Sequence, residues 1–193
     1  MRELLTRQEN LKYRLILEGI AVGLLAGLVS SAFRWTLIKA EDIRNLFLEG
    51  ARQSAALAVL GIFLLGVLAA FVGFLLKREP LISGSGIPQV EGEMHGKINA
   101  NWLQVLIAKF LGAVCAIGGG LSLGREGPSI QLGAMVGKGF SRVNNRFRTE
   151  EKLLMTCGAG AGLAGGQPPA APFARLYLGC DDGADTGFAR LDA

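Results

Sequence analysis

An uncharged segment of 22 residues, Ala55–Leu76, constrains the fold of this chain more than any other feature. A helix needs about 20 apolar residues to cross the hydrocarbon core of a bilayer, and this segment has that length. It ends at Lys77-Arg78-Glu79-Pro80, where charges and a proline mark the exit of a helix. Because a spanning segment must satisfy its own backbone polar groups in lipid, the segment predicts a helical membrane protein.

Two further apolar runs support this interpretation. Ile16–Phe33 contains one charged residue, Glu18, and three glycines spaced every four residues, which predict a face for close helix contact. These glycines are Gly19, Gly23 and Gly27. We expect this helix to continue to about Lys39, with residues 40–54 forming a loop or a helix end. The alternative for this run is the core helix of a soluble protein.

The third apolar run, Trp102–Leu123, contains an ionisable residue, Lys109. A charge at membrane depth is costly and usually paired. We therefore expect Lys109 either to hold helices together, through a carboxylate or backbone carbonyls, or to act directly in transport.

The later segments predict shorter helices. Pro128–Arg142 predicts a helix, and a charged loop is expected over residues 142–152. Leu153–Ala164 begins another helix rich in small residues. Both helices carry glycines in close-contact spacing, Gly133 with Gly137 and Gly158 with Gly162. Between the second and third runs, four polar residues predict a solvated helix face or loop: Glu91, Glu93, His95 and Lys97.

Composition and motifs argue against several classes of protein. The net charge of +4 comes without a basic block, so nucleic-acid binding has no support. Cys115, Cys157 and Cys180 lack metal or redox spacing, and the single histidine cannot form a metal site alone. The segment 119–126 has the glycines of a phosphate-binding loop but not its Lys-Ser/Thr pair. We therefore expect no enzyme, no metal and no cofactor.

Two interrupted segments lie within the apolar part of the chain, Gly84–Pro88 and Gly124–Pro128. Each contains glycines that break a helix and a proline that suits the first turn of the next one. Glu126 is expected at or just before a helix N-terminus, which carries a partial positive charge and free N–H groups. Broken helices whose N-termini point at an anion are typical of transporters. Ser85 is then either an anion ligand or an ordinary N-cap serine.

The two pentapeptides Gly84-Ser85-Gly86-Ile87-Pro88 and Gly124-Arg125-Glu126-Gly127-Pro128 resemble the CLC chloride channels and chloride/proton antiporters. The Lys109 segment between them and the later run 158–164 strengthen the likeness, which covers about residues 10–164. The resemblance implies an all-α membrane protein with part of a CLC-type bundle of tilted and broken transmembrane helices. We divide the chain into an amphipathic segment at 1–14, a partial CLC-like transmembrane domain at 15–164 and an irregular tail at 165–193.

The resemblance also implies roles for individual residues. Ser85 would offer its hydroxyl to chloride, and the backbone of Gly84 and Ser85 would line the inner part of the path. The N–H groups of Arg125, Glu126 and Gly127 would line an outer chloride site. Glu126 would be the gate, and in antiporters it would also carry the proton. Gln89 stands where many members have glutamate.

The tail departs from the family pattern at Gly165-Gly166-Gln167-Pro168-Pro169. Later family segments that complete the chloride site and most of the homodimer interface have no counterpart in the sequence. We expect an integral, multi-pass protein of the plasma or inner membrane whose partners are chloride, lipid and, in an antiporter, protons. Its function is then chloride transport by a chain that is incomplete for it, or that of a non-conducting truncated or frameshifted fragment.

Overall fold

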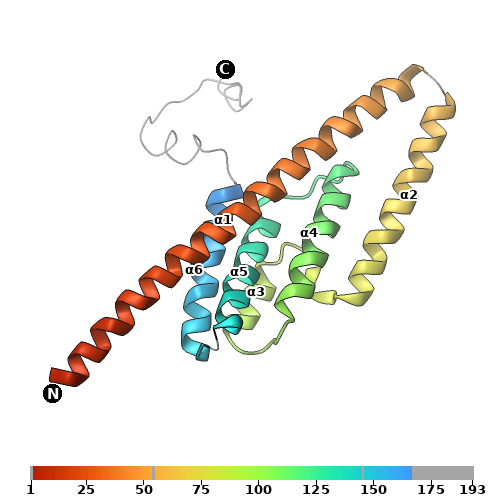
Figure 1. Cartoon of the computed structure of the whole chain (residues 1–193). Helices are drawn as coiled ribbons and strands as arrows, with labels where there is room; N and C mark the ends of the chain where they lie inside the picture. The colour runs from red at the N-terminus through yellow and green to blue at the C-terminus, as the bar shows by residue number, and fades with distance from the viewer. Residues whose placement is uncertain (1, 54, 145, 167–193) are drawn as a thin grey trace, which may run out of the picture.

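The computed structural model describes residues 2–53, 55–144 and 146–166, and all regular elements in this part of the chain are helical. A short 3-10 helix, η1 (Pro80–Ile82), separates the first two α-helices from the other four. The α-helices are α1 (Arg2–Gln53), α2 (Ala55–Arg78), α3 (Ile87–Met94), α4 (Trp102–Gly118), α5 (Glu126–Val143) and α6 (Arg148–Gly166). Figure 1 shows α1 crossing the group formed by α3–α6, with α2 folding back from its far end.

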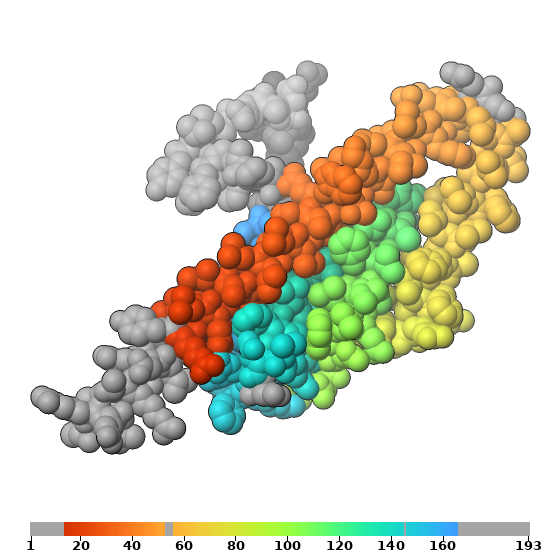
Figure 2. All heavy atoms as spheres, in the orientation of Figure 1, coloured from red at the N-terminus to blue at the C-terminus, as the bar shows by residue number. Residues whose placement is uncertain are grey.

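Helix α1 is longer than the sequence indicates. Its 52 residues include residues 2–14 of the predicted amphipathic segment and the first apolar run without a break. Residues 40–53 continue the helix, so the loop alternative for 40–54 is wrong, and the helix ends at Gln53. At 1.5 Å per residue the helix is about 78 Å long. Figure 2 shows the coloured part of this helix lying across the surface of the bundle.

Within the described residues, two helices are long and apolar enough, by length and composition, to cross a membrane. They are the Arg14–Arg52 part of α1 and Ala56–Arg78 in α2. The third apolar run forms a helix only from Trp102 to Gly118, which is shorter than these two. Its last residues belong instead to the non-helical connection that precedes α5.

The small-residue faces of α5 and α6 pack directly on each other. A Cβ atom added to Gly133 would lie 2.1 Å from the carbonyl oxygen of Gly158, and one added to Gly137 would lie 2.3 Å from that of Leu154. Two backbones can come this close only where side chains are absent. The predicted close-contact spacings in both helices therefore identify the faces that meet.

The glycine face of α1 also packs on α6, but less tightly. A Cβ atom on Gly19 would lie 3.8 Å from the sulfur of Cys157, and one on Gly23 would lie 3.9 Å from Cβ of Ala161. These are ordinary van der Waals separations. Helix α6 thus lies between α5 and α1, and it also approaches the α1 backbone near its end, where a Cβ on Gly165 would lie 3.0 Å from the Gly27 carbonyl oxygen.

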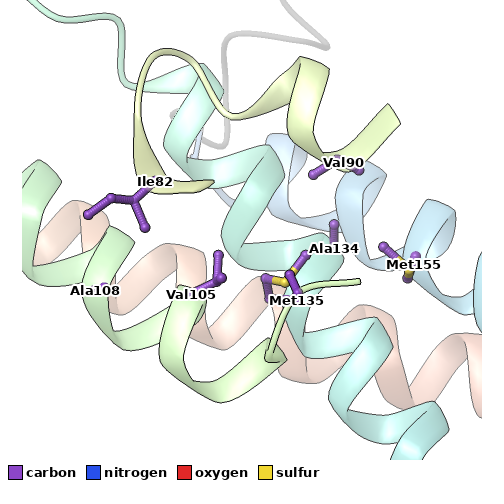
Figure 3. Packing of buried hydrophobic residues seen from close by; sticks show 8 residues of the cluster. Ile82, Val90, Val105, Ala108, Ala134, Met135 and Met155 are labelled. Atoms are coloured by element: carbon purple, nitrogen blue, oxygen red, sulfur yellow. The ribbon is translucent and has the colours of Figure 1, made fainter. Parts of the chain in front are cut away.

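Most of the buried apolar residues that the structure describes form two clusters. The first joins η1, α3, α4, α5 and α6 (Figure 3) through Ile82, Val90, Ala100, Val105, Ala108, Ala134, Met135 and Met155. The second joins α1 to α4 and α5 through Phe33, Leu37, Ala113, Ile117 and Leu132. Phe33 also stacks edge-to-face on Phe110, with ring centroids 5.4 Å apart. Helices α3 and α5, which carry the two interrupted segments, are therefore fixed in one core.

A buried ion pair also connects α3 and α5. Lys138 contacts Glu93, and both side chains are almost fully buried. The Lys138 ammonium also donates to the carbonyl of Ala100 at 2.6 Å, and the Ala100 N–H donates to Glu93 at 3.1 Å. The predicted solvation of Glu93 is therefore wrong, because this carboxylate lies inside the bundle and has charged and neutral donors. Lys138 is a charged residue within a helix rich in small residues, as Lys109 is within an apolar helix.

The structure changes the boundaries predicted for the loop at 142–152 and for the start of the tail at 165. The charged loop expected over 142–152 is shorter, because α5 runs to Val143 and α6 begins at Arg148. Helix α6 continues through Gly165 and Gly166. The rest of the tail predicted at 165–193 lies outside the described residues.

The close contact of α5 with α6 gives a test of this packing. Gly133→Ala should destabilise the protein by about 1–3 kcal/mol, because the new methyl group meets the Gly158 carbonyl. Gly160→Ala is the matched control, since a Cβ on Gly160 has nothing within 4 Å, and it should be neutral or slightly stabilising. Thermal unfolding in detergent measures both variants. Equal melting temperatures for the two would contradict the packing.

Candidate functional site

The first interrupted segment forms a turn that ends in a helix N-terminus. Gly84 and Gly86 both adopt positive φ, +66° and +88°, which glycine tolerates more easily than other residues. Gly86 is the N-cap of α3, and Pro88 lies in the first turn as the sequence predicts. The N-cap reading of Ser85 does not hold, although its Oγ accepts a long hydrogen bond of 3.4 Å from the Ile87 N–H.

The second interrupted segment starts helix α5. Arg125 is the N-cap and Glu126 the first helical residue, so the predicted position of Glu126 is confirmed. The first helical hydrogen bond, from the Ser129 N–H to the Arg125 carbonyl, is 3.4 Å long. The N–H groups of Glu126 and Gly127 precede it, in the first turn of the helix, where N–H groups point toward the helix N-terminus.

The two helix starts meet at Ser85 and Gly127, which are 42 residues apart in the sequence. A Cβ atom on Gly127 would lie 2.4 Å from the Ser85 carbonyl oxygen and 3.0 Å from Ser85 Cα. Only glycine at position 127 allows this approach. As a result, the positive ends of α3 and α5 converge.

A pocket of about 470 Å³ lies where they converge. Its polar lining comes from both helix starts and from α4: Ser83, Gly84, Ser85, Lys109, Glu126 and Gly127. Its apolar lining includes Val72 and Leu76 of α2 and Ala113 of α4. Four of the five sequence-predicted site residues therefore line one pocket. Arg125 is the exception.

Arg125 turns its side chain toward α1. Its guanidinium contacts Glu41 at 2.5 Å, and the Arg125 side chain is about half exposed. This pair connects the start of α5 to the part of α1 after Lys39, where the sequence left a loop and a helix end as alternatives. Only the backbone of Arg125 is then available for the role that the family resemblance implies.

Lys109 reaches from α4 to the first interrupted segment. Its ammonium donates two hydrogen bonds of 2.8 Å, to the carbonyls of Ile82 and Gly84. The residue is 3% exposed. Of the two roles that the sequence leaves open, the structure shows the pairing with backbone carbonyls. The hydrogen bonds also place a cation beside the pocket.

Two glutamines contact the same segment, and the sequence analysis did not single them out for this role. Gln89 of α3 donates to the Ser83 carbonyl at 2.9 Å, and Gln131 of α5 donates to the Leu81 carbonyl at 2.9 Å. Gln131 belongs to no motif, whereas Gln89 directly follows the Gly84–Pro88 pentapeptide. The carbonyl partners of both are fixed by how the helices pack, so the local sequence does not predict these hydrogen bonds.

A second pocket, of about 440 Å³, lies among polar residues near the start of α6. Asn99, Arg142, Arg146, Arg148 and Glu151 line it. Arg142 pairs with Glu151 at 3.0 Å and Arg146 pairs with Glu18, so most of its charge is compensated. Among the described residues, no three metal-ligating side chains come together. The pocket between the helix starts is therefore the candidate site.

The chemistry of that pocket suits a small anion. Two helix N-termini, a hydroxyl and a lysine ammonium supply donors and positive potential. Glu126 is the one acidic residue among the described residues that line the pocket. A helical membrane protein with interrupted helices whose N-termini converge on one polar pocket is the class that this fold and site define.

Comparison with known proteins supports this class. The family model described as voltage gated chloride channel matches residues 68–166, and this range includes both interrupted segments. The chain belongs to this family.

Similar proteins include the H(+)/Cl(-) exchange transporters ClcA of Vibrio cholerae serotype O1 (strain ATCC 39541 / Classical Ogawa 395 / O395) and of Salmonella arizonae (strain ATCC BAA-731 / CDC346-86 / RSK2980). The first is 35% identical over 81% of this chain and 34% of its own, and the second is 34% identical over 83% and 34%. A solved slow cyanobacterial Cl-/H+ antiporter has 32% identity and a TM-score of 0.74 over 79% of this chain and 36% of its own. The chain thus spans about a third of the length of the curated relatives that it matches.

The Lys109 hydrogen bonds predict that replacing this lysine with an uncharged residue lowers the stability of the protein. Lys109→Met should destabilise the protein by about 1–3 kcal/mol, because it leaves the Ile82 and Gly84 carbonyls without their donor. Lys97→Met removes an exposed lysine and is the control. Thermal unfolding in detergent compares the two, and a Lys109→Met protein as stable as the control would show that these bonds contribute little.

Proposed function

We propose that this chain contributes to chloride transport of the CLC type by forming one part of an anion path. The observation that carries the proposal is the convergence of the α3 and α5 N-termini on one pocket that also contains Ser85 and Glu126. Membership of the family and the printed functions of its relatives support chloride as the anion.

The proposed contacts with chloride are all hydrogen-bond donors. Ser85 would donate its hydroxyl, and Gly84, Glu126 and Gly127 would offer backbone N–H groups. The backbone of Arg125 would act at the outer end, as the family resemblance implies. A chloride ion here would be stabilised by two helix dipoles without a buried cation in direct contact. The Lys109 ammonium would add positive potential while remaining bonded to carbonyls.

Glu126 would act as the gate. As the first residue of α5, its carboxylate lies at the positive end of that helix, where an anion would also bind. Chloride and the carboxylate would compete for this position, and protonation would remove the negative charge from the side chain. In an exchanger the same carboxyl group would carry the proton.

The proposed location in a membrane rests on the family and on the two apolar helices. Family membership makes this an integral membrane protein, and α1 and α2 supply two long apolar helices. We propose a multi-pass position in the plasma or inner membrane. The exposed apolar side chains of α1 and α2 would then face lipid or further helices, including those of a second copy.

The relative lengths favour a second candidate function. Because the chain spans about a third of its curated relatives, the described helices would form only part of the wall of a transport path. The chain would then be a non-conducting membrane protein, either by itself or until it assembles with other chains. This alternative predicts anion binding or insertion without flux.

A chloride flux measurement separates the two functions. We expect the 193-residue polypeptide, reconstituted alone in liposomes, to insert but to release chloride no faster than empty liposomes. Chloride needs a continuous polar path, because a charge in hydrocarbon is costly. Efflux clearly above the empty control, together with loss of its pH dependence in Glu126→Gln, would show instead that this polypeptide is itself a transporter.

Binding by Ser85 gives a test that does not depend on flux. Ser85→Ala removes one hydroxyl donor, which is worth about 0.5–1.5 kcal/mol, so chloride should bind about two- to tenfold more weakly. Ser31→Ala, on the exposed surface of α1, is the control. Calorimetric titration in chloride-free detergent solution gives both affinities. An unchanged affinity with normal insertion would remove Ser85 from the site.

A further inference from the structure

One end of the bundle brings together the start of α4, the end of α5 and the start of α6 (Figure 1). Backbone hydrogen bonds hold the turn between α5 and α6. The Arg146 N–H donates to the Ser141 carbonyl at 3.1 Å, and the Glu151 N–H donates to the Phe147 carbonyl at 2.9 Å. In a helical membrane protein, helix ends lie near the boundary between hydrocarbon and water. Side chains at this end of the bundle are therefore placed to meet lipid headgroups.

Two pockets at this end share part of their lining. The arginine pocket, as we call the cavity of about 440 Å³ near the start of α6, is lined by Asn99, Arg142, Arg146, Arg148 and Glu151. A second cavity, of about 390 Å³, shares Asn99 and Arg142 with it and is also lined by Trp102. Because they have two residues in common, the two cavities adjoin, and Trp102 lies next to the arginine pocket.

Two of the three arginines keep hydrogen-bond donors for a further acceptor. Arg142 donates to Glu151 at 3.0 Å and to the Asn99 side chain at 3.2 Å, which leaves part of its guanidinium group for another partner. Arg148 is exposed and forms no ion pair with any residue that the structure describes. Its Nη1 lies beside the α3–α4 connection, 3.3 Å from the position of a Cβ atom on Gly96. The compensation of charge in this pocket is therefore incomplete.

Arg146, the third arginine, is mostly buried and joins helices. Its guanidinium pairs with Glu18 of α1 and lies 3.7 Å from Glu150 of α6. Its Nε is buried and has no acceptor among the described residues. Such a donor is uncommon in folded proteins, where water or an ion usually satisfies it. The arginine pocket is thus short of acceptors, although it is lined by donors on all three arginines.

The surroundings of the pocket are cationic and also carry exposed apolar side chains. Arg14 and Lys152 border it in addition to its three arginines, and the neighbouring carboxylates are those of Glu18, Glu150 and Glu151, so five cations meet three anions. Phe147, between two of the arginines in sequence, is 80% exposed, and Val143, next to the third, is 74% exposed. This combination complements a molecule with an anionic head and an apolar tail.

We propose that the arginine pocket binds the phosphate group of an anionic phospholipid. Arg142 and Arg148 would donate to the phosphate oxygens, whose geometry suits a planar guanidinium group. Phe147 would lie among the upper parts of the acyl chains, as apolar side chains do at a membrane interface. A soluble anion needs no apolar contact, so the exposed phenylalanine favours a lipid, and basic pockets between transmembrane helices suit lipid headgroups. The proposal uses the membrane location of the family but not the binding of chloride.

Trp102 provides a fluorescent probe for this site. In a Trp35→Phe background it is the one tryptophan of the sequence, and phospholipids brominated in their acyl chains quench a nearby indole. Titration of the full chain in detergent with brominated phosphatidylglycerol, and separately with brominated phosphatidylcholine, gives both affinities. We expect the anionic lipid to bind about ten- to thirtyfold more tightly, because each of two arginines near its headgroup contributes about a factor of five.

Arg148→Gln should lower this preference about fivefold. Its melting temperature should not change, because Arg148 forms no ion pair with the described residues that could be lost. Arg148→Lys keeps the charge and should retain most of the preference. Arg52→Gln is the matched control, since Arg52 is also exposed at a helix end, in the last turn of α1, and it should change neither property.

Phe147→Ser separates the apolar contact from the charge. It should weaken the binding of both lipids and leave the ratio of their affinities unchanged, whereas Leu121→Ser, an exposed position in the connection between α4 and α5, should have no effect.

Three results would overturn the proposal. The first is equal affinity of the wild-type chain for the two lipids, and the second is an Arg148→Gln protein that behaves like the Arg52→Gln control. The third is displacement of phosphatidylglycerol by inorganic phosphate at the same concentration, which would make the pocket a site for a soluble anion. None of these measurements involves chloride, so failure of the proposed function would be seen separately, in the flux and calorimetry experiments.

Discussion

The site depends on how the backbone polar groups of an interrupted helix are satisfied at membrane depth. Lipid offers no hydrogen-bond partners, so non-helical backbone there requires partners from the protein or from a water-filled cavity. The Lys109 ammonium meets this need at Ile82 and Gly84 on one side of the segment. Because those carbonyls are bound, the turn can end in a helix N-terminus that opens on a pocket. The converging N-termini, the approach of Gly127 to Ser85 and the position of Glu126 all follow from a turn held in this way.

A second constraint acts further along the same helices. Glu93 and Lys138 form a buried pair between α3 and α5, with Ala100 supplying both a donor and an acceptor. Breaking one partner of such a pair typically costs about 3–5 kcal/mol, because the other charge stays buried. The pair also ties together the two helices whose N-termini form the site, so it helps to fix their relative position. Glycine contacts between α5 and α6 fix α5 from its other side.

Sequence reasoning located features whose physical signal is local. The long uncharged segment predicted α2, and the glycines and prolines of the two pentapeptides predicted where α3 and α5 start. The spacing of glycines predicted the faces through which α5 and α6 pack. It failed where the deciding partner is distant in the sequence. Glu93 looks solvated because its neighbours are polar, yet its partner Lys138 lies 45 residues later. The carbonyl partners of Gln89 and Gln131 are set by helix packing, so the local sequence did not predict them. The polar residues after Lys39 suggested a loop, although the helix continues there and places Glu41 beside Arg125.

The length of α1 has a mechanical consequence. A straight helix of about 78 Å is far longer than the roughly 30 Å hydrocarbon core of a bilayer, so it must lean strongly or extend beyond it. Its distal part carries Glu41, which is bonded to the residue that caps α5. A change in bilayer thickness alters the tilt that best suits such a helix. The Glu41–Arg125 contact connects α1 to the residue immediately before Glu126, so a change in the tilt of α1 would act on the start of α5.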